Sequence, residues 1–249
     1  NQAYVSILSL DYVSDTFLCT TLGDGPAAIG TVEHLLAAVN ALQVTGLTIN
    51  VYGHELPILD GSCEGWVDAL QSTRLVSAGN QHTYVAQERF TFCGKNSSYI
   101  IEPFEEDSLA IETTYIPANK SHSPQFFRYI HSPKNFIERL MCYKTFCYKQ
   151  DIDALRSMNK IKGGSLDNAI VLDDGVPINS NVLQDGTELA RHKCLDFIGD
   201  LSLLGFLPSA LIKIENPNHT DNISFMKAFQ TFIQLQRRSS VAEYQANSF

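Results

Sequence analysis

The sequence lacks any apolar run close to the ~18 residues that a membrane-spanning helix needs, so no membrane span is predicted. The first ten residues carry no positively charged segment, and no secretory signal peptide is predicted there. The six cysteines are scattered and include no Cys-x-x-Cys pair. This pattern predicts free thiols in a reducing compartment rather than a disulfide framework.

Basic residues are also scarce. The 249 residues include 18 Lys and Arg against 27 Asp and Glu, for a net charge of −9. A general nucleic-acid binder needs a basic excess, so that class is excluded, although a local basic pocket for a phosphate group is compatible with this balance. Glycine-rich phosphate loops are missing as well. The pair Gly163 and Gly164 has no Walker A or G-x-G-x-x-G context and predicts either a tight turn or the close approach of a ligand.

Repeats and low-complexity tracts are absent, and 44% apolar against 18% charged residues indicates a folded chain of one large or two small domains. Helical and strand patterns follow one another in an α+β order, with helices packed against sheets in two similar layered domains. Strands are expected at 47–52, 84–92, 98–102, 109–116, 169–172 and 211–214, and helices at 32–42, 66–70, 135–144, 188–204 and 223–235. Residues 76–82 are a candidate linker, and residues 237–249 are expected to form a frayed tail.

The predicted helix at 188–204 carries three polar side chains on one stripe. His192, Asp196 and Asp200 follow at intervals of four residues, whereas most of the helix around them is apolar. A helix that is apolar on nearly all sides is normally buried, and buried imidazole and carboxylate groups must be paired or bound to a metal. His and Asp one turn apart can reach one zinc ion. The alternative is a solvated or salt-bridged helix face.

Two further segments could carry chemistry. Thr31 is a candidate N-cap that would put Glu33 and His34 in the first helical turn, where the dipole favours a carboxylate and a neutral imidazole. The alternative there is a capped helix with Glu and His on its surface. His219 lies in a predicted strand-to-helix loop, where it could be a general acid or a capping side chain.

These weak signals occur together in an order that resembles one family. The segments are TVEHLLAAVNAL at 31–42, ELPILDGS at 55–62, KTF at 144–146, GGSLDNAIVLDD at 163–174, RHKCLDFIGDL at 191–201 and HTDN at 219–222. From about Thr16 to about Leu235 the chain resembles the UDP-3-O-acyl-N-acetylglucosamine deacetylases, the LpxC family. These are zinc amidases whose reaction commits the pathway to lipid A.

The resemblance implies a role for each matching residue. Zinc would be held by His34, His192 and Asp196, with a fourth position left for water. Glu33 would be the general base, and His219, held protonated by Asp200, would stabilise charge and protonate the leaving amine. Thr145 would donate a hydrogen bond to the oxyanion, and Lys193 would help to hold the substrate or the developing charge. The products would be acetate and the free 2-amino sugar nucleotide.

The resemblance also implies an apolar passage for the acyl chain of the substrate. The residues expected to bind substrate are Leu18, Phe146, Ile152, Ile161, Ser165, Leu166 and Val171. The passage segment would be an insertion near 146–172 within a second domain at 83–236, followed by the tail at 237–249. The first domain would span 1–78, and the zinc would lie between the two domains.

Some features depart from most bacterial members. The family's first strands, with their G-x-G-L-H-x-G segment, are expected to be missing, because the chain begins inside the first domain and without Met. The sequences around Phe146–Cys147 and Ile161–Gly164 look more like plant members. A bacterial member would be cytoplasmic and a plant-type member mitochondrial.

The expected partner is an acylated UDP-amino sugar bound by a monomer. Two alternatives to this activity remain. One is a non-catalytic or truncated homologue that binds a sugar nucleotide or a partner, and the other is a zinc amidohydrolase for a different N-acetyl sugar.

Overall fold

A computed structural model describes residues 9–73, 83–117, 123–158, 160–179 and 183–246, with side chains described as far as residue 238. The helices are α1 (Glu33–Ala41), α2 (Glu64–Gln71), α3 (Pro133–Arg139), α4 (Lys149–Ser157), α5 (Glu188–Leu201) and α6 (His219–Ala246), with short 3-10 turns η1 (Leu10–Tyr12), η2 (Gly25–Ala27) and η4 (Ser202–Leu204). The strands are β1 (Val13–Asp15), β2 (Thr21–Leu22), β3 (Thr83–Val85), β4 (Phe90–Cys93), β5 (Ser98–Glu102), β6 (Leu109–Tyr115), β7 (Gln125–Ile130), β8 (Phe146–Tyr148), β9 (Ile170–Asp173), β10 (Val176–Pro177) and β11 (Leu207–Glu215). The fold class is α+β, as predicted.

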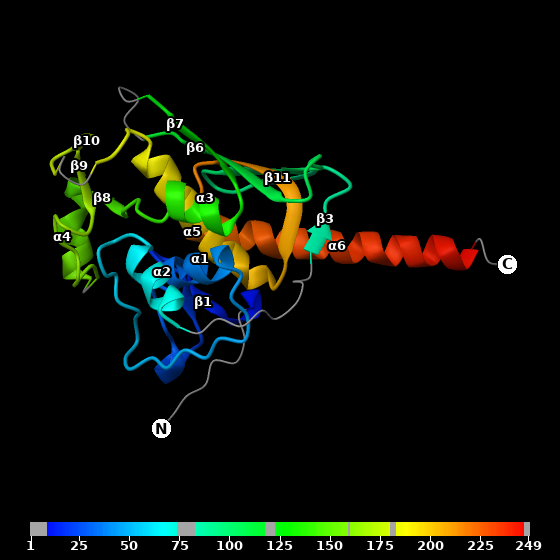
Figure 1. The fold of residues 1–249 in the computed structure, drawn as a ribbon, viewed down its shortest axis with the longest axis horizontal. Coiled ribbons are helices and arrows are strands. Elements are labelled where there is room, and N and C mark those ends of the chain that lie inside the picture. Colours follow the sequence, from blue (N-terminus) through cyan, green and yellow to red (C-terminus); the bar gives the residue numbers. More distant parts are fainter. Residues whose placement is uncertain (1–8, 74–82, 118–122, 159, 180–182, 247–249) are drawn as a thin grey trace.

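The largest sheet has six strands in the order β4-β5-β11-β6-β7, with β3 pairing the start of β11. The central strand β11 runs antiparallel to β5 and parallel to β6. Helices α5 and α6 cover one face of this sheet (Figure 1). Burial alternates along β5, as expected for a strand with one face against a core. Stacked rings of Tyr99 on β5 and Phe225 on α6 join the sheet to the helix layer.

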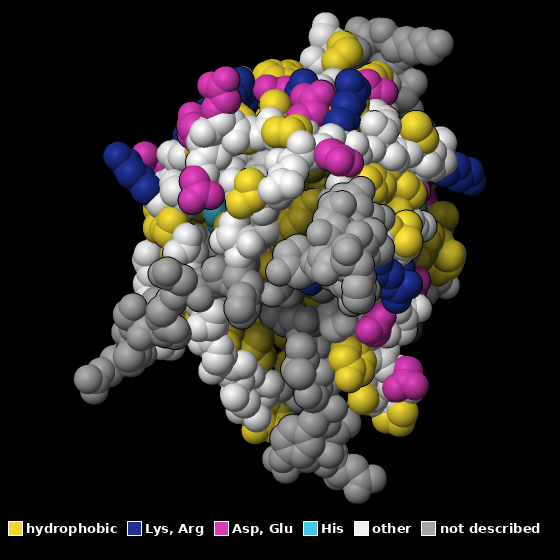
Figure 2. Space-filling view, turned by 90° about the vertical axis from the view of Figure 1, so that its right-hand side faces the viewer, with side chains coloured by type: hydrophobic (Ala, Val, Ile, Leu, Met, Phe, Trp, Pro, Cys, Tyr) yellow, Lys and Arg dark blue, Asp and Glu magenta, His cyan; other side chains and the backbone are white. Residues whose placement is uncertain are grey.

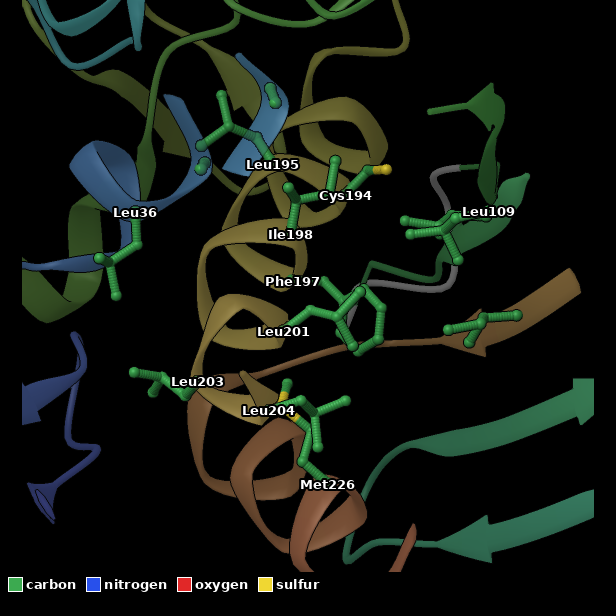
Figure 3. Packing of buried hydrophobic residues seen from close by; sticks show 14 of the residues in the cluster. Leu36, Leu109, Cys194, Leu195, Phe197, Ile198, Leu201, Leu203, Leu204 and Met226 are labelled. Carbon is green, nitrogen blue, oxygen red and sulfur yellow. The ribbon is translucent and has the colours of Figure 1, made fainter. Parts of the chain in front are cut away.

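Helix α5 lies between α1 and the sheet, and it is buried on nearly all sides (Figure 3). This burial agrees with the prediction from its apolar residues. The two helices meet backbone to backbone at Gly199, where an added Cβ would lie only 2.1 Å from the carbonyl oxygen of Glu33. Only glycine permits this approach. The close crossing brings the start of α1 against the middle of α5, which is where the candidate site lies.

Strands β8, β9 and β10 form a separate small sheet, against which α4 packs. Strand β8 is parallel to β9, and α4 makes the crossover between them. Ile170, Leu172 and Leu189 form the buried centre of a small cluster here, against which Phe146 and Tyr148 pack. This unit contains residues 146–172, and the prediction that they form an insertion within a second domain stays a prediction.

Several predicted elements differ from the structure. The strand predicted at 47–52 does not form, because the described chain offers it no partner strand, and Tyr52 is 98% exposed. The strand predicted at 84–92 is two strands, since β3 pairs with β11 and β4 pairs with β5. Strand β7 was not predicted. Helix α3 covers 133–139 rather than 135–144. The residues that follow it form backbone hydrogen bonds to another segment instead, because the Met141 carbonyl accepts from the Cys63 N–H and the Thr145 N–H donates to the Gly61 carbonyl.

The frayed tail predicted from residue 237 is also wrong, because α6 continues to Ala246. Its last turns project beyond the rest of the molecule (Figure 1). Apolar periodicity ends where the helix leaves the sheet, although the helical hydrogen bonding continues. Residues 247–249 and the candidate linker at 76–82 lie outside the described residues.

Charged side chains are mixed in sign on the face seen in Figure 2, where Lys and Arg lie among Asp and Glu. This agrees with the absence of a basic excess from the sequence. None of the helices in the described part of the chain combines the length and apolar character that crossing a membrane requires. All six cysteines have free thiols, as predicted.

Candidate active site

The start of α1 differs from the predicted N-cap. Thr31 has a left-handed backbone (φ 59°), and Val32 occupies the cap position without a side-chain cap bond. The Thr31 hydroxyl instead donates to Glu55 at 2.8 Å. Glu33 and His34 nevertheless lie in the first turn, and both are buried rather than on the surface. Their burial follows from the crossing of α1 over α5.

Two imidazoles and one carboxylate meet at this crossing. The Nε2 atom of His34 lies 3.6 Å from Asp196 Oδ1, and the Nε2 atom of His192 lies 3.3 Å from the same oxygen. The two rings contact edge to face at 5.1 Å between centroids. All three side chains are buried, and in the described chain they are the group of ligand atoms close enough to share one metal ion. The alternative of a solvated helix face is therefore wrong, because the face is buried, although Asp196 does pair with His192 and Lys193 on it.

The geometry suits a tetrahedral metal ion. Bonds of roughly 2.1 Å to a tetrahedral zinc ion separate its ligand atoms by roughly 3.4 Å, close to the 3.3 and 3.6 Å found here. The Nδ1 atom of His192 lies 3.0 Å from the carbonyl oxygen of Tyr143. Donation to that carbonyl fixes the tautomer that leaves Nε2 with a free electron pair.

The protonation states also suit a metal. Burial lowers the pKa of His192 to about 4, so the imidazole is neutral near pH 7. Burial alone would raise the pKa of Asp196, but the Lys193 ammonium, 3.0 Å from Oδ2, helps to hold it well below the usual range. The Nδ1 atom of His34 is buried without a hydrogen-bond partner among the described residues. The neutral imidazole of His192 beside the ionised carboxylate of Asp196 is what a zinc ion requires.

Glu33 lies next to these ligands. Its Oε2 atom accepts a hydrogen bond of 3.0 Å from the backbone N–H of Thr20, and its Oε1 atom is 3.7 Å from His219 Nε2. Burial raises the pKa of this carboxyl group, and His219 partly offsets that rise. A carboxylate with a raised pKa is a stronger base, which suits it to accept a proton from a reacting group.

His219 is the first residue of α6, separated from the end of β11 by three residues, rather than a loop residue as predicted, and it faces Glu33 across the site. Its Nδ1 atom is 2.8 Å from Asp200 Oδ2. Burial alone would lower the pKa of His219, but the Asp200 and Glu33 carboxylates raise it to about 9. The imidazole is therefore protonated near neutral pH and can act as an acid. Asn222, one turn further along α6, donates to the same Asp200 oxygen at 2.8 Å.

The other predicted catalytic residues lie beside this centre. The ring of Phe146 contacts the His192 ring at 6.2 Å between centroids. Thr145 precedes it and is held by its backbone, because its N–H donates to Gly61 and its carbonyl accepts from Ile170. The Lys193 ammonium lies 3.0 Å from Asp196 Oδ2 and 5.2 Å from the centre of the Phe146 ring.

The residues predicted for an acyl passage are spread over the small sheet unit and one loop. Ile152 is on α4 and Val171 is buried on β9, whereas Leu166 is 52% exposed between them. Ile161 has a left-handed backbone (φ 49°). Ser165 is in the turn closed by Asn168, and Leu18 lies exposed between β1 and β2. A passage along these residues stays a prediction.

Sequence reasoning missed four contributors to the site. They are Thr20, the backbone carbonyl of Tyr143, Gly199 and Asn222. A glycine inside a helix of apolar residues could have indicated a close helix crossing at Gly199. Nothing in the local sequence distinguishes Thr20 or Tyr143, because their contacts join segments far apart in the chain.

A His-His-Asp cluster beside a buried carboxylate, with a protonated histidine opposite, is typical of a metal-assisted hydrolase. The family model described as LpxC, UDP-3-O-acyl N-acetylglycosamine deacetylase, matches residues 2–231. The chain therefore belongs to the LpxC family.

Curated relatives with the name UDP-3-O-acyl-N-acetylglucosamine deacetylase agree with this assignment. The chain is 35% identical to one from Legionella pneumophila strain Corby over 198 residues, which are 79% of this chain and 65% of the relative. It is 33% identical to one from Anaeromyxobacter dehalogenans over 220 residues, 87% of this chain and 70% of the relative. The chain thus spans slightly less than two thirds of the Legionella protein.

Proposed function

We propose that this chain removes the N-acetyl group from UDP-3-O-(3-hydroxyacyl)-N-acetylglucosamine, giving acetate and the free amino sugar nucleotide in lipid A synthesis. The observation that carries the proposal is the buried cluster of His34, His192 and Asp196 with Glu33 on one side and protonated His219 close by. Family membership supplies the substrate class. The proposed compartment is the cytoplasm, since the relatives named above are bacterial, and the proposed state is a monomer.

Zn²⁺ is the proposed cofactor, with His34, His192 and Asp196 as its ligands. When bound there, zinc would lower the pKa of a water molecule to about 7 and polarise the acetamide carbonyl. The neutral imidazole of His192 and the short distances between the ligand atoms support this choice. The carbonyl of Tyr143 supports it as well, because it orients the His192 ring from behind.

Glu33 is the proposed general base. It would take the proton from the attacking water as the new C–O bond forms at the acetamide carbon. Two contacts hold the carboxylate in place, a hydrogen bond from the Thr20 N–H and an ion pair with the His219 imidazolium. Its raised pKa favours acceptance of the proton.

His219 is the proposed general acid. Its Nδ1–H bond to Asp200 leaves the Nε2 atom to carry the transferable proton, and Nε2 lies 3.7 Å from a Glu33 oxygen and 3.9 Å from an Asp196 oxygen. It would transfer this proton to the amine as the C–N bond breaks. Thr145 would donate a hydrogen bond to the oxyanion. Lys193 would supply a local positive charge for the anionic nucleotide substrate, which the net negative charge of the chain does not attract.

A deacetylation assay on the acylated sugar nucleotide, with and without a chelator, tests the proposal. We expect about one zinc per chain and turnover that is lost on chelation and restored by zinc. A monodisperse, zinc-loaded protein without turnover would instead support a non-catalytic homologue. The same assay on UDP-N-acetylglucosamine without the acyl chain separates the two enzymatic possibilities, because equal turnover of both substrates would indicate a different amidohydrolase.

A further inference from the structure

Thr20 is a fully buried polar residue whose hydroxyl has no part in the catalytic roles proposed above. It precedes the short strand β2 and contacts Glu33, the proposed base, and Asp200, which supports the proposed acid His219. Its backbone N–H donates to Glu33 Oε2 at 3.0 Å, and its hydroxyl donates to Asp200 Oδ1 at 2.6 Å. One residue therefore contacts both the proposed base and the carboxylate that supports the proposed acid.

The hydrogen bonds of Asp200 show what the hydroxyl contributes. Asp200 Oδ2 receives two donors, the Nδ1 atom of His219 and the Nδ2 atom of Asn222. Among the described residues, the donor to Oδ1 is the Thr20 hydroxyl. A buried carboxylate with one oxygen unsatisfied is costly and is free to rotate towards another partner. The hydroxyl thus fixes the plane of the carboxylate against which the imidazole lies.

We propose that Thr20 is a positioning residue of the same reaction, which holds the Glu33 and Asp200 carboxylates in one arrangement. The inference rests on the proposed function for its readout. Thr20 is not a catalytic residue, because a side chain that is fully buried in the structure does not contact substrate. It acts through the two carboxylates, one bound by its main chain and the other by its side chain, and its hydroxyl oxygen also lies 3.2 Å from the Nδ1 atom of His219.

The main-chain and side-chain contacts can be separated by substitution. Thr20→Val keeps the shape and the N–H but removes the hydroxyl, whereas Thr20→Ser keeps both donors. Thr16→Val is the matched control, since Thr16 lies on the same segment and its hydroxyl pairs with Thr220 in an exposed position, away from both carboxylates.

Steady-state kinetics on the zinc-loaded full chain test the proposal. For Thr20→Val we expect kcat to fall roughly 10- to 100-fold with KM unchanged, the range expected from losing a hydrogen bond to a buried charged group. Thr20→Ser should restore most of kcat, and Thr16→Val should match the wild type. Unchanged kcat in Thr20→Val would overturn the proposal. Equal loss in Thr20→Ser would overturn it too, because packing of the methyl group would then be responsible.

The wild-type chain provides a second test that needs neither turnover nor a folded variant. A hydroxyl that is buried and donates to a carboxylate exchanges slowly with water, so NMR should detect a Thr20 hydroxyl proton close to Asp200. A rapidly exchanging Thr20 hydroxyl would refute the contact. An inactive wild type that still shows this proton would count against the proposed function alone.

Discussion

The crossing of α1 and α5 at Gly199 makes a prediction that connects the fold to the metal site. In Gly199→Ala the new Cβ would lie 2.1 Å from the Glu33 carbonyl oxygen. Ordinary contact needs roughly 3.4 Å, so the helices must separate by roughly 1.3 Å. The new Cβ is fixed to the α5 backbone and the atoms that it meets are backbone atoms of α1, so no side-chain rotation can relieve the clash.

The magnitude follows from two opposing effects. Alanine favours a helix over glycine by about 1 kcal/mol. Overpacking costs about 1–3 kcal/mol, and a backbone contact belongs at the upper end of that range or above it. We therefore expect Gly199→Ala to lower the free energy of unfolding by about 2 kcal/mol or more.

The metal site should suffer as well. His34 belongs to α1, whereas His192 and Asp196 belong to α5, so a separation of the helices changes the distances between ligand atoms. Metal–ligand distances tolerate only about 0.2 Å of change. We expect zinc affinity, measured by competition with a chromogenic chelator, to fall at least tenfold.

The control is Gly65→Ala on α2. There the nearest atom to a new Cβ is the tip of the Leu59 side chain at 2.9 Å, which can rotate away. Urea unfolding of both variants and the wild type gives the comparison. Gly65→Ala should be close to neutral or slightly stabilising. If Gly199→Ala kept both the wild-type unfolding midpoint and the wild-type zinc affinity, the reasoning about the helix crossing would be refuted.

Two further predictions concern single carboxyl groups. Glu33→Gln should keep about one zinc per chain but lose 10²- to 10⁴-fold in turnover, because the amide cannot accept the proton; near-wild-type turnover would show that Glu33 is not the base. Glu188 accepts backbone hydrogen bonds from Gln184, Asp185 and Gly186, and these overcome the effect of burial to lower its pKa below 4.5. A lowered folded pKa means that its stabilisation is present above pH 4.5 and is lost as the pH falls through the folded value. Glu188→Gln should therefore destabilise the protein at pH 7, in urea unfolding, and the gap to wild type should close on acidification. A gap that widened towards low pH would contradict this.

Local patterns in the sequence predicted what depends on neighbouring residues. The period of the apolar positions placed α1 and α5, and the spacing of His192 and Asp196 put two ligands on one face of a helix. Helix geometry alone determines which residues share a face, so such predictions need no knowledge of the rest of the fold. The motif combination, taken together, indicated the family that the comparisons confirm.

Contacts between distant segments were beyond such patterns. The strand predicted at 47–52 shows this, because an apolar alternation forms a strand only where a partner strand is available. The length of α6 shows it too, since helical hydrogen bonding continues after the apolar stripe has ended. Burial of Glu33 and His34, which local reasoning left open, depends on the approach of α5.

The sequence by itself therefore determined the α+β class, the two helices that matter and the identity of the candidate ligands. Only the tertiary structure decided how those side chains are held. Thr20 and Asp200 are 180 residues apart along the chain, and the Tyr143 carbonyl that orients His192 is 49 residues away. Such pairs meet because packing of α1, α5 and the sheet brings them together, and no local propensity encodes that meeting.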